Sequence, residues 1–217
     1  MTRLKCTVVT NEEQNWFVPF ARHLVEQLKR VADASLVFSH CAVYLSDIVF
    51  YLGYHSIVPD DVLALGGNNV VVHGSNLPKG RGWAPLTWQV LEGHDQITLT
   101  LFEATTRVDA GPIYLQEQLS FNGTELIDEM RELVGALTIS MCQNFVDNYP
   151  QVVQSATQQT GESTYYSRRI PSDSRLDPEK TITEQFNLLR VVDNERYPAF
   201  FELYGRRYLL TIEACDE

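Results

Sequence analysis

Residues 71–116 read VVHGSNLPKGRGWAPLTWQVLEGHDQITLTLFEATTRVDAGPIYLQ and contain the clearest fold signals of the chain. The apolar run at 70–72 predicts a buried strand that ends at His73. Residues 85–93 begin with Pro and end with Gly, which is typical of a short helix. Residues 96–102 alternate between apolar and polar side chains and predict a further strand.

The same patterns extend outward on both sides of this stretch. Further strands are expected at 4–9, 34–38, 47–52 and 112–119, helices at 16–31, 124–149 and 178–191, and a hairpin at 200–203 and 207–212 that turns at Tyr204-Gly205. Continuous apolar strands that alternate with helices favour an α/β fold. We therefore expect a Rossmann-like, mostly parallel sheet with helices on both faces, and a small C-terminal appendage of one helix and a β-hairpin.

The domain organisation follows from length and from one polar segment. A chain of 217 residues is long enough for one sizeable core with a small addition. The polar segment QVVQSATQQTGES interrupts the apolar periodicity after the longest helix. We expect a main domain at 1–150, a linker at 151–163 and a small C-terminal subdomain at 164–217.

Charge and cysteine usage exclude several classes. Lys and Arg number 17 against 28 Asp and Glu, a net charge of −11. This disfavours binding to a nucleic-acid backbone, which needs basic patches. No apolar run reaches the ~18 residues that span a bilayer, and the N-terminus does not resemble a signal peptide. We expect a cytoplasmic protein without membrane contact, whose cysteines at 6, 41, 142 and 215 are free thiols.

His73 and Asp109 are the first candidates for chemistry. Ligands of open α/β sheets bind beyond the carboxyl ends of the strands, where His73 is predicted to lie. Asp109 occupies a turn between two later strands, so the two side chains are suited to form an acid/base pair. Two alternatives remain open from the residues alone. One is a structural histidine with an ordinary turn aspartate. The other is a hydrolase triad with Ser75, although the G-x-S-x-G elbow is missing.

The whole pattern resembles the folate-dependent formyltransferase family. It runs His73-Gly-Ser-x-Leu-Pro-Lys-x-Arg-Gly, continues with a Pro, a Trp and a Gly at 85, 88 and 93, and ends in Asp109-Ala-Gly. The segment DIVFYLGYHSIVP at 47–59 also resembles this family. The His-Gly-Ser-x-Leu-Pro-Lys form is most similar to the nucleotide-sugar N-formyltransferases, and the first 120 residues are similar to the catalytic domain of methionyl-tRNA formyltransferases.

The resemblance implies a transferase. N10-formyltetrahydrofolate would donate a formyl group to the amine of a nucleotide-linked 4-amino-deoxy sugar, and no metal would take part. His73 and Asp109 match the catalytic His and Asp of the family. The tail, with Val-Asp-Asn-Glu-Arg-Tyr-Pro at 192–198, is similar to enzymes of bacterial surface-glycan pathways, of which a pseudaminic-acid type is our expectation.

The resemblance also implies two sets of binding residues. The folate pocket would be lined by Gly53, Tyr54, Ile57, Val108 and Gly111. Arginine pairs well with phosphates and carboxylates, and the expected substrate contacts are Lys79, Arg81, Tyr166, Arg168 and Arg169.

One position departs from the family. Its catalytic set includes an Asn two residues before the His, where this chain has Val71. Asn69 lies ~13 Å from His73 along a strand, so Ser75 or Asn76 is expected to supply the auxiliary oxyanion contact. Val71 also supports an alternative, a folate- or nucleotide-sugar-binding protein that has lost catalysis. A third alternative is another amine acceptor, and a homodimer formed through the aromatic tail is considered.

Overall fold

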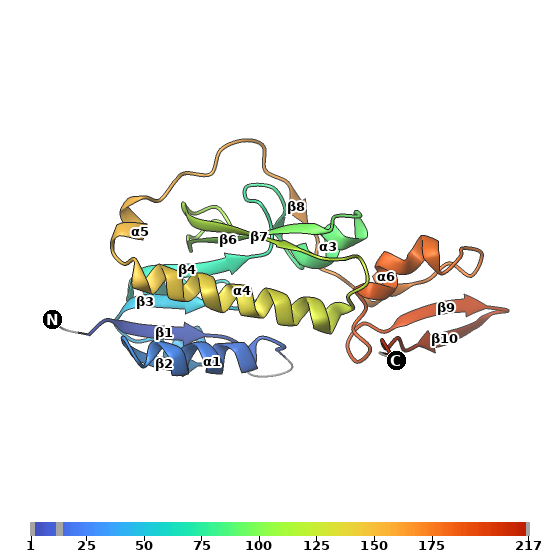
Figure 1. Ribbon diagram of the computed structural model, residues 1–217, viewed down its shortest axis with the longest axis horizontal. Coiled ribbons are helices and arrows are strands. Elements are labelled where there is room, and N and C mark those ends of the chain that lie inside the picture. Colours follow the sequence, from blue (N-terminus) through green and yellow to red (C-terminus); the bar gives the residue numbers. More distant parts are fainter. Residues whose placement is uncertain (1–2, 12–14, 216–217) are drawn as a thin grey trace.

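A six-stranded sheet forms the centre of the molecule in the computed structural model, which describes residues 3–11 and 15–215 (Figure 1). The strand order is β2-β1-β3-β4-β6-β7. Strands β1 to β4 are parallel to one another, and β6 is antiparallel to both β4 and β7. These strands are β1 (Lys5–Val9), β2 (Asp33–Val37), β3 (Ser46–Tyr51), β4 (Gly66–His73), β6 (Gln96–Glu103) and β7 (Ile113–Ser120).

Alternate residues of the strands supply two apolar layers. Cys6, Ile48 and Val70 face one side, where α1 and α4 cover the sheet. Val9 and Val49 face the other side, which is covered by α2 and by residues after the 3-10 helix η1. The helices are α1 (Val18–Leu28), η1 (His40–Ala42), α2 (Asp60–Leu63), α3 (Pro85–Leu91), α4 (Ile127–Asp147) and α5 (Gln151–Gln154). This α/β architecture confirms the expected mostly parallel sheet with helices on both faces.

Strand β4 is longer than the apolar run at 70–72 predicts. It begins at Gly66 because its polar start is stabilised by specific partners. The Asn68 side chain donates to Glu103 and to the Tyr114 hydroxyl, and the Asn69 side chain donates to the Leu63 carbonyl. Glu103 and Tyr114 lie 35 and 46 residues after Asn68, so local hydropathy does not reveal these two contacts.

The helix expected at 178–191 is also shorter. It consists of η3 (Thr183–Gln185) and α6 (Phe186–Arg190). The Thr181 side chain and backbone exchange hydrogen bonds with Glu184, which is the pattern of a helix start. The helical segment therefore begins after Thr181 rather than at Pro178.

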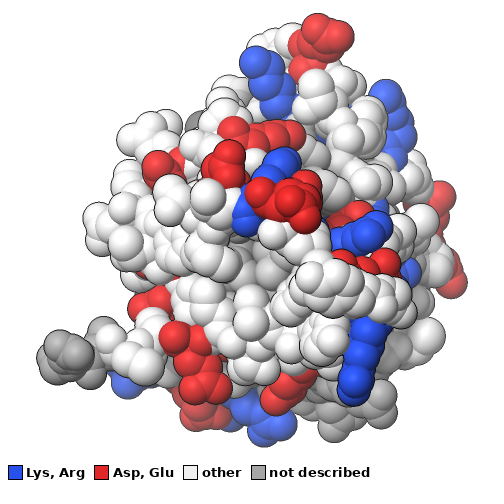
Figure 2. Space-filling view, turned by 90° about the vertical axis from the view of Figure 1, so that its right-hand side faces the viewer, with Lys and Arg blue, Asp and Glu red and all other residues white. Residues whose placement is uncertain are grey.

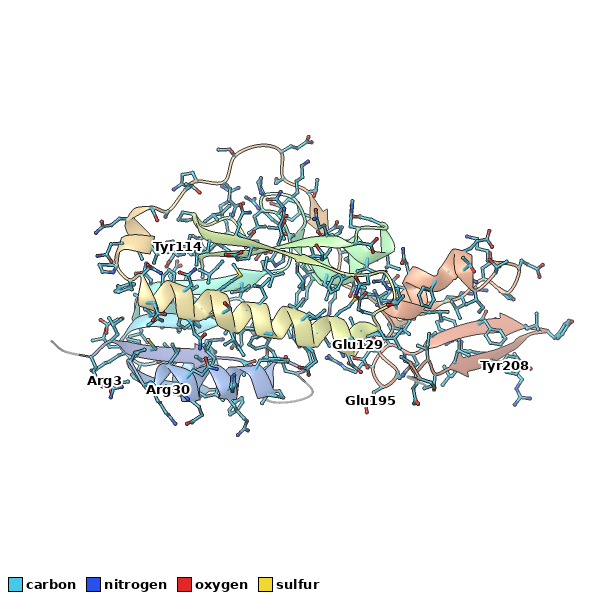
Figure 3. All side chains as sticks on the ribbon, viewed as in Figure 1. Arg3, Arg30, Tyr114, Glu129, Glu195 and Tyr208 are labelled. Atoms are coloured by element: carbon cyan, nitrogen blue, oxygen red, sulfur yellow. The ribbon has the colours of Figure 1, made fainter. Side chains whose placement is uncertain are left out.

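The C-terminal part of the chain ends in the expected hairpin, β9 (Ala199–Leu203) and β10 (Arg206–Leu210), which turns at Tyr204-Gly205. The hairpin projects from the end of the molecule, so that Tyr208 lies far from Tyr114 of the sheet (Figure 3). Acidic and basic side chains are mixed on this end (Figure 2). The remaining short elements are β5 (Arg81–Gly82), β8 (Tyr165–Tyr166) and η2 (Pro171–Ser174).

The segment expected as a linker lies against the main sheet. It contains α5, and Thr157 exchanges backbone hydrogen bonds of 2.7 and 2.9 Å with Ile113 of β7. Beyond it, β8 pairs with β5, which ties the later part of the chain to the loop after β4. The segment 151–163 is therefore bonded to the start of β7, four residues after Asp109.

Two further expectations concern the chain as a whole. All four cysteines are free, with Cys6 and Cys142 buried and Cys41 and Cys215 exposed, and this confirms the expected thiols. In the described ranges, no helix combines the length and apolar character that crossing a membrane would require.

Candidate active site

His73 ends β4 at the edge where the parallel strands β1 and β3 also end. Its side chain is buried, and Nε2 lies 2.8 Å from the carbonyl oxygen of Gly80. Because a carbonyl oxygen only accepts, Nε2 must carry a hydrogen and donate it. The same nitrogen lies 3.8 Å from Oδ2 of Asp109. His73 and Asp109, which were expected to act together, are therefore neighbours, and the Nε2–H of His73 lies between the Gly80 carbonyl and the Asp109 carboxylate.

Asp109 reaches His73 only because its loop turns back over the sheet. Glu103, the last residue of β6, pairs with Val70, which lies three residues and ~10 Å before His73 along β4. Residues 104–112 must return over this length. Gly111 makes the turn possible, since a Cβ there would overlap the Glu103 carbonyl oxygen. The carboxylate of Asp109 then accepts a 2.8 Å hydrogen bond from the Gly82 N–H.

The hydrolase alternative finds no support in the geometry. The Ser75 hydroxyl is buried and makes no hydrogen bond within the described part of the chain. A serine nucleophile needs a base in hydrogen-bond contact, whereas Nε2 of His73 donates to Gly80. The Ser75 hydroxyl is thus an unsatisfied polar group beside the site rather than an activated nucleophile.

The amide that the family pattern places two residues before the histidine is missing. Val71 lies on the same face of β4 as His73 and packs into the apolar layer with Tyr51 and Val49. The Asn68 amide is bonded to Glu103 and Tyr114 of the sheet, and the Asn69 amide is bonded to the Leu63 carbonyl of α2. No neighbouring Asn of β4 therefore takes the place of this group.

Asn76 lies in the loop after β4 and faces Gln116 of β7. Its Oδ1 accepts a 3.0 Å hydrogen bond from Gln116, which orients the amide. Asn76, Ser75 and Lys79 line a cleft of about 520 Å³ together with Tyr166 and Glu92. Tyr166 donates to Glu92 at 2.6 Å, and burial together with this bond raises the pKa of the Tyr166 hydroxyl. The cleft thus joins four of the expected site residues.

The expected arginines have different surroundings. Arg81 is buried and donates to Gln159 and Tyr165. Arg169 is turned into the C-terminal part, where it donates to the Val191 carbonyl and to Ser174. Arg168 is exposed, with its guanidinium 5.0 Å from the centre of the Trp83 ring. Among the three, only Arg168 presents its charge to solvent.

Trp83 connects the expected folate loop with the site. It follows Gly82, the donor to Asp109, and its ring stacks on His55 at 6.0 Å. Burial, followed by the charges of Arg196 and Arg168, lowers the pKa of His55. Trp83 itself is 39% exposed, and an exposed apolar side chain stands on each of two further loops, Ile57 two residues after His55 and Val108 next to Asp109.

The other expected folate residues shape the loop after β3. Gly53 has a φ of +57°, and its carbonyl accepts from Asn15. Tyr54 turns toward η1, where its hydroxyl contacts the ring and the backbone N–H of His40. Gly53 therefore allows the chain to turn after β3, and the Tyr54 hydroxyl fixes this turn to His40.

Sequence reasoning missed three groups at the site. Gly80 supplies the acceptor for His73, Trp83 supplies the stack, and the Gln159 amide bonds to the carbonyls of Asp109 and Gly111. The turn at 80–82 is visible in the sequence, but nothing local to Gln159 indicates a partner 50 residues earlier. In the ranges that the structure describes, no group of three or more His, Cys, Asp or Glu side chains is arranged to hold a metal ion.

Comparison with known proteins agrees with this geometry. The sequence pattern described as formyl transferase matches residues 12–138, which include His73 and Asp109. This match spans more than half of the 217 residues. The chain therefore belongs to the formyl transferase family.

Solved structures share the fold at low sequence identity. A methionyl-tRNA formyltransferase from Clostridium thermocellum superposes with a TM-score of 0.80 at 18% identity, over 94% of this chain and 90% of that one. A sugar N-formyltransferase from a Shewanella species gives 0.70 at 13% identity, over 99% of both chains. HypX from Aquifex aeolicus, in complex with tetrahydrofolic acid, gives 0.75 at 16%, over 96% of this chain and 37% of that one.

Proposed function

We propose that this protein transfers the formyl group of N10-formyltetrahydrofolate to the amine of a nucleotide-linked 4-amino-deoxy sugar. The observation that carries the proposal is the His73–Asp109 pair at the edge of the sheet, within the part of the chain that matches the family. A sugar N-formyltransferase of the same fold superposes on this protein over 99% of each chain, which supports an amino sugar as the acceptor.

The surface around the pair suits a folate donor. The exposed side chains of Ile57, Val108 and Trp83 offer apolar contacts to a flat ring. A structure of the same fold is a complex with tetrahydrofolic acid. Gly53 and Gly111 set the two loops that present Ile57 and Val108, and Trp83 stands on the loop after β4. We therefore assign this surface to the donor and the cleft with Lys79 and Tyr166, together with Arg168, to the acceptor.

The residues of the chain divide the reaction between them. N10-formyltetrahydrofolate supplies an electrophilic formyl carbon, and its C–N10 bond breaks as the bond to the amine forms. The Nε2–H of His73 exchanges its Gly80 acceptor for the formyl oxygen, on which negative charge develops. The Asp109 carboxylate accepts the proton that the amine loses and passes the same proton to N10 as N10 departs, so that Asp109 ends ionised again.

A second hydrogen-bond donor is needed because Val71 provides none. We assign it to Asn76, whose oxygen is already bound by Gln116, so that its NH₂ group is directed away from that partner. Ser75 contributes an unpartnered hydroxyl at the same cleft. Arg169 bonds inside the C-terminal part, and we do not include it among the substrate contacts.

The remaining parts of the proposal concern organisation. We assign catalysis to residues 1–150 and a supporting role to residues 164–217, with a second copy of the chain contacting the exposed Tyr204 and Leu209 of the hairpin. We place the reaction in the cytoplasm, which the four free thiols support. A bacterial surface glycan of the pseudaminic-acid type is the proposed destination of the product.

A turnover assay tests the proposal. N10-formyltetrahydrofolate is supplied with a panel of UDP- and dTDP-linked 4-amino-6-deoxy sugars, and mass spectrometry detects the gain of one formyl group. His73→Ala and Asp109→Asn are each expected to lower kcat by ~10²–10⁴-fold, as for the loss of acid/base groups. Asn76→Ala is expected to lower it by ~10²-fold, as for one oxyanion donor.

Matched controls keep this assay specific. His23→Ala and Asp147→Asn replace an exposed histidine of α1 and an exposed aspartate of α4, and both should retain wild-type turnover. Product from a different amine would redirect the proposal to that acceptor. Folate binding without product from any acceptor would contradict the enzyme and support a binding protein, with Val71 as the mark of a lost oxyanion donor.

A further inference from the structure

The backbone of Asp109 is held in a costly conformation. Its φ is +49°, in the left-handed region that residues with a Cβ seldom adopt. Left-handed backbone at a residue with a Cβ is less stable than ordinary backbone, although Asp tolerates it better than most residues do. The conformation therefore requires contacts that hold it, and its side-chain bond to Gly82 N–H is only one of them.

The second contact comes from Gln159, 50 residues later in the chain. Its Nε2 donates to the carbonyl oxygens of Asp109 and Gly111, each at 2.9 Å. These two carbonyls lie on either side of Ala110, so one amide bridges the turn. The loop is thus held at its side chain by Gly82 and at its backbone by Gln159.

The amide of Gln159 is itself oriented by Arg81. The Nη2 of Arg81 donates to the Gln159 Oε1 at 2.6 Å. A guanidinium only donates and a carbonyl only accepts, so the amide fits in one orientation alone. A glutamate in this position would keep the Arg81 contact but would direct a second acceptor at two carbonyl oxygens.

The segment around Gln159 is fixed as well. Thr157 exchanges two backbone hydrogen bonds with Ile113, at the start of β7 and only four residues after Asp109. Gln159 is partly buried, whereas its neighbour Gln158 is exposed. The Gln159 amide therefore connects two backbone segments, around Thr157 and around Ile113, that are already bonded to each other.

We propose that Gln159 is a positioning residue, which holds the 107–111 turn so that the Asp109 carboxylate stands beside His73. Arg81 serves it by fixing the amide. The inference deepens the proposed function and rests on it for its kinetic readout. It also assigns a role to a segment that the sequence presents as a plain polar linker.

Three variants separate this role from general stability. Gln159→Ala removes the bonds to both carbonyls and the bond from Arg81, Gln159→Glu keeps the Arg81 contact and loses the donor, and Gln158→Ala is the matched control. We expect both Gln159 variants to lower kcat by ~10²-fold with little change in KM, as for a misplaced catalytic group. The control should match the wild type.

A double-mutant cycle tests whether Gln159 acts through Asp109. In an Asp109→Asn background, Gln159→Ala should cost much less than the ~10²-fold expected in the wild type, because residues that act as a unit are not additive. An undiminished loss in that background would overturn the positioning role. Equal kcat for Gln159→Ala, Gln159→Glu and wild type would overturn it as well.

Hydrogen exchange gives a readout that needs no turnover. Amide exchange in peptides covering 104–112 should rise in both Gln159 variants and not in Gln158→Ala, while peptides of β1 and β3 remain as in the wild type. Unchanged exchange at 104–112 would overturn the proposal. If the wild type forms no formylated product, the proposed function fails, and this exchange result alone decides whether Gln159 holds the turn.

Discussion

Two buried arginines of this chain differ in what surrounds their charge. Arg190 of α6 is 1% exposed, and its guanidinium faces the carboxylates of Glu125 at 3.3 Å and Asp95 at 3.6 Å. Arg81 is 7% exposed and donates to the neutral groups of Gln159 and Tyr165. In the described part of the chain, no carboxylate oxygen lies within ion-pair distance of Arg81, and its Nε is unpartnered.

The two arginines therefore have different roles: Arg190 attaches the C-terminal part to the main sheet, and Arg81 positions the Gln159 amide. Arg190 also donates to the Glu125 carbonyl, so it fastens the C-terminal part to the loop between β7 and α4. Breaking a buried ion pair leaves an uncompensated charge and is strongly destabilising. Arg81 has no ion pair of this kind to break, and its contacts lead to the Asp109 turn. We therefore expect Arg190 to matter for folding and Arg81 for rate.

The largest expected effect is on stability. Arg190→Met should lower the free energy of unfolding by ~3–5 kcal/mol, because Glu125 loses its buried partner. Urea unfolding followed by circular dichroism measures this, with the exposed Arg30→Met as control. A loss below 1 kcal/mol would remove the distinction between the two arginines.

The same variant has a pH signature. Burial raises the pKa of Glu125. Hydrogen bonds from the N–H groups of Asn122 and Gly123 and the charge of Arg190 together lower it by more than burial raises it, so the net pKa lies below the ordinary 4.5. This carboxylate therefore stabilises the fold above pH 4.5, and the contribution is lost as the pH falls through the folded-state pKa. The difference between wild type and Arg190→Met should shrink on acidification.

A smaller effect is expected on rate at the other arginine. Arg81→Met should change the free energy of unfolding by no more than ~1 kcal/mol, because a buried cation without a carboxylate partner gives way to an apolar side chain of similar length. It should nevertheless lower kcat by ~10-fold, since the Gln159 amide loses its orienting donor. Steady-state kinetics and urea unfolding on one preparation test both parts. A large stability loss with normal kcat would reverse the comparison.

The smallest effect concerns the rim of the site. Burial is the main cause of the lowered pKa of His55, followed by the charges of Arg196 and Arg168. Arg168→Ala should therefore raise the pKa of His55 toward its usual value. NMR titration of the His55 ring measures this, and Arg30→Ala should leave it unchanged. An unmoved titration would show that the Arg168 guanidinium does not act on His55.

Much of the fold was predictable because its signals are local. The strands at 47–52 and 96–102 and the turn at Tyr204-Gly205 agree with the structure to within a residue. Each depends on apolar runs or turn residues that act within a few positions. The polar start of β4 was not predicted, because the partners of Asn68 lie 35 and 46 residues away. The helix start after Thr181 was missed although its Thr-x-x-Glu capping pattern is local.

The site divides in the same way. His73 was predictable because a strand end is a local feature and the loop motif follows it directly. The surroundings of the two neighbouring arginines were not, since Arg168 and Arg169 have the same local sequence. One is exposed over Trp83, and the other is bonded to the Val191 carbonyl. Packing of the C-terminal part, and not residue type, separates them.

By itself, the sequence determined the strands, the helices and the residue types that formyl transfer requires, because periodicity and motif spacing act over short distances. Only the tertiary structure decided how Asp109 meets His73. The last residue of β6 lies level with Val70, so the loop must return across the sheet and hold a left-handed residue at its tip. Gln159 holds that turn from 50 residues away, and a contact of this range arises only when the chain has folded.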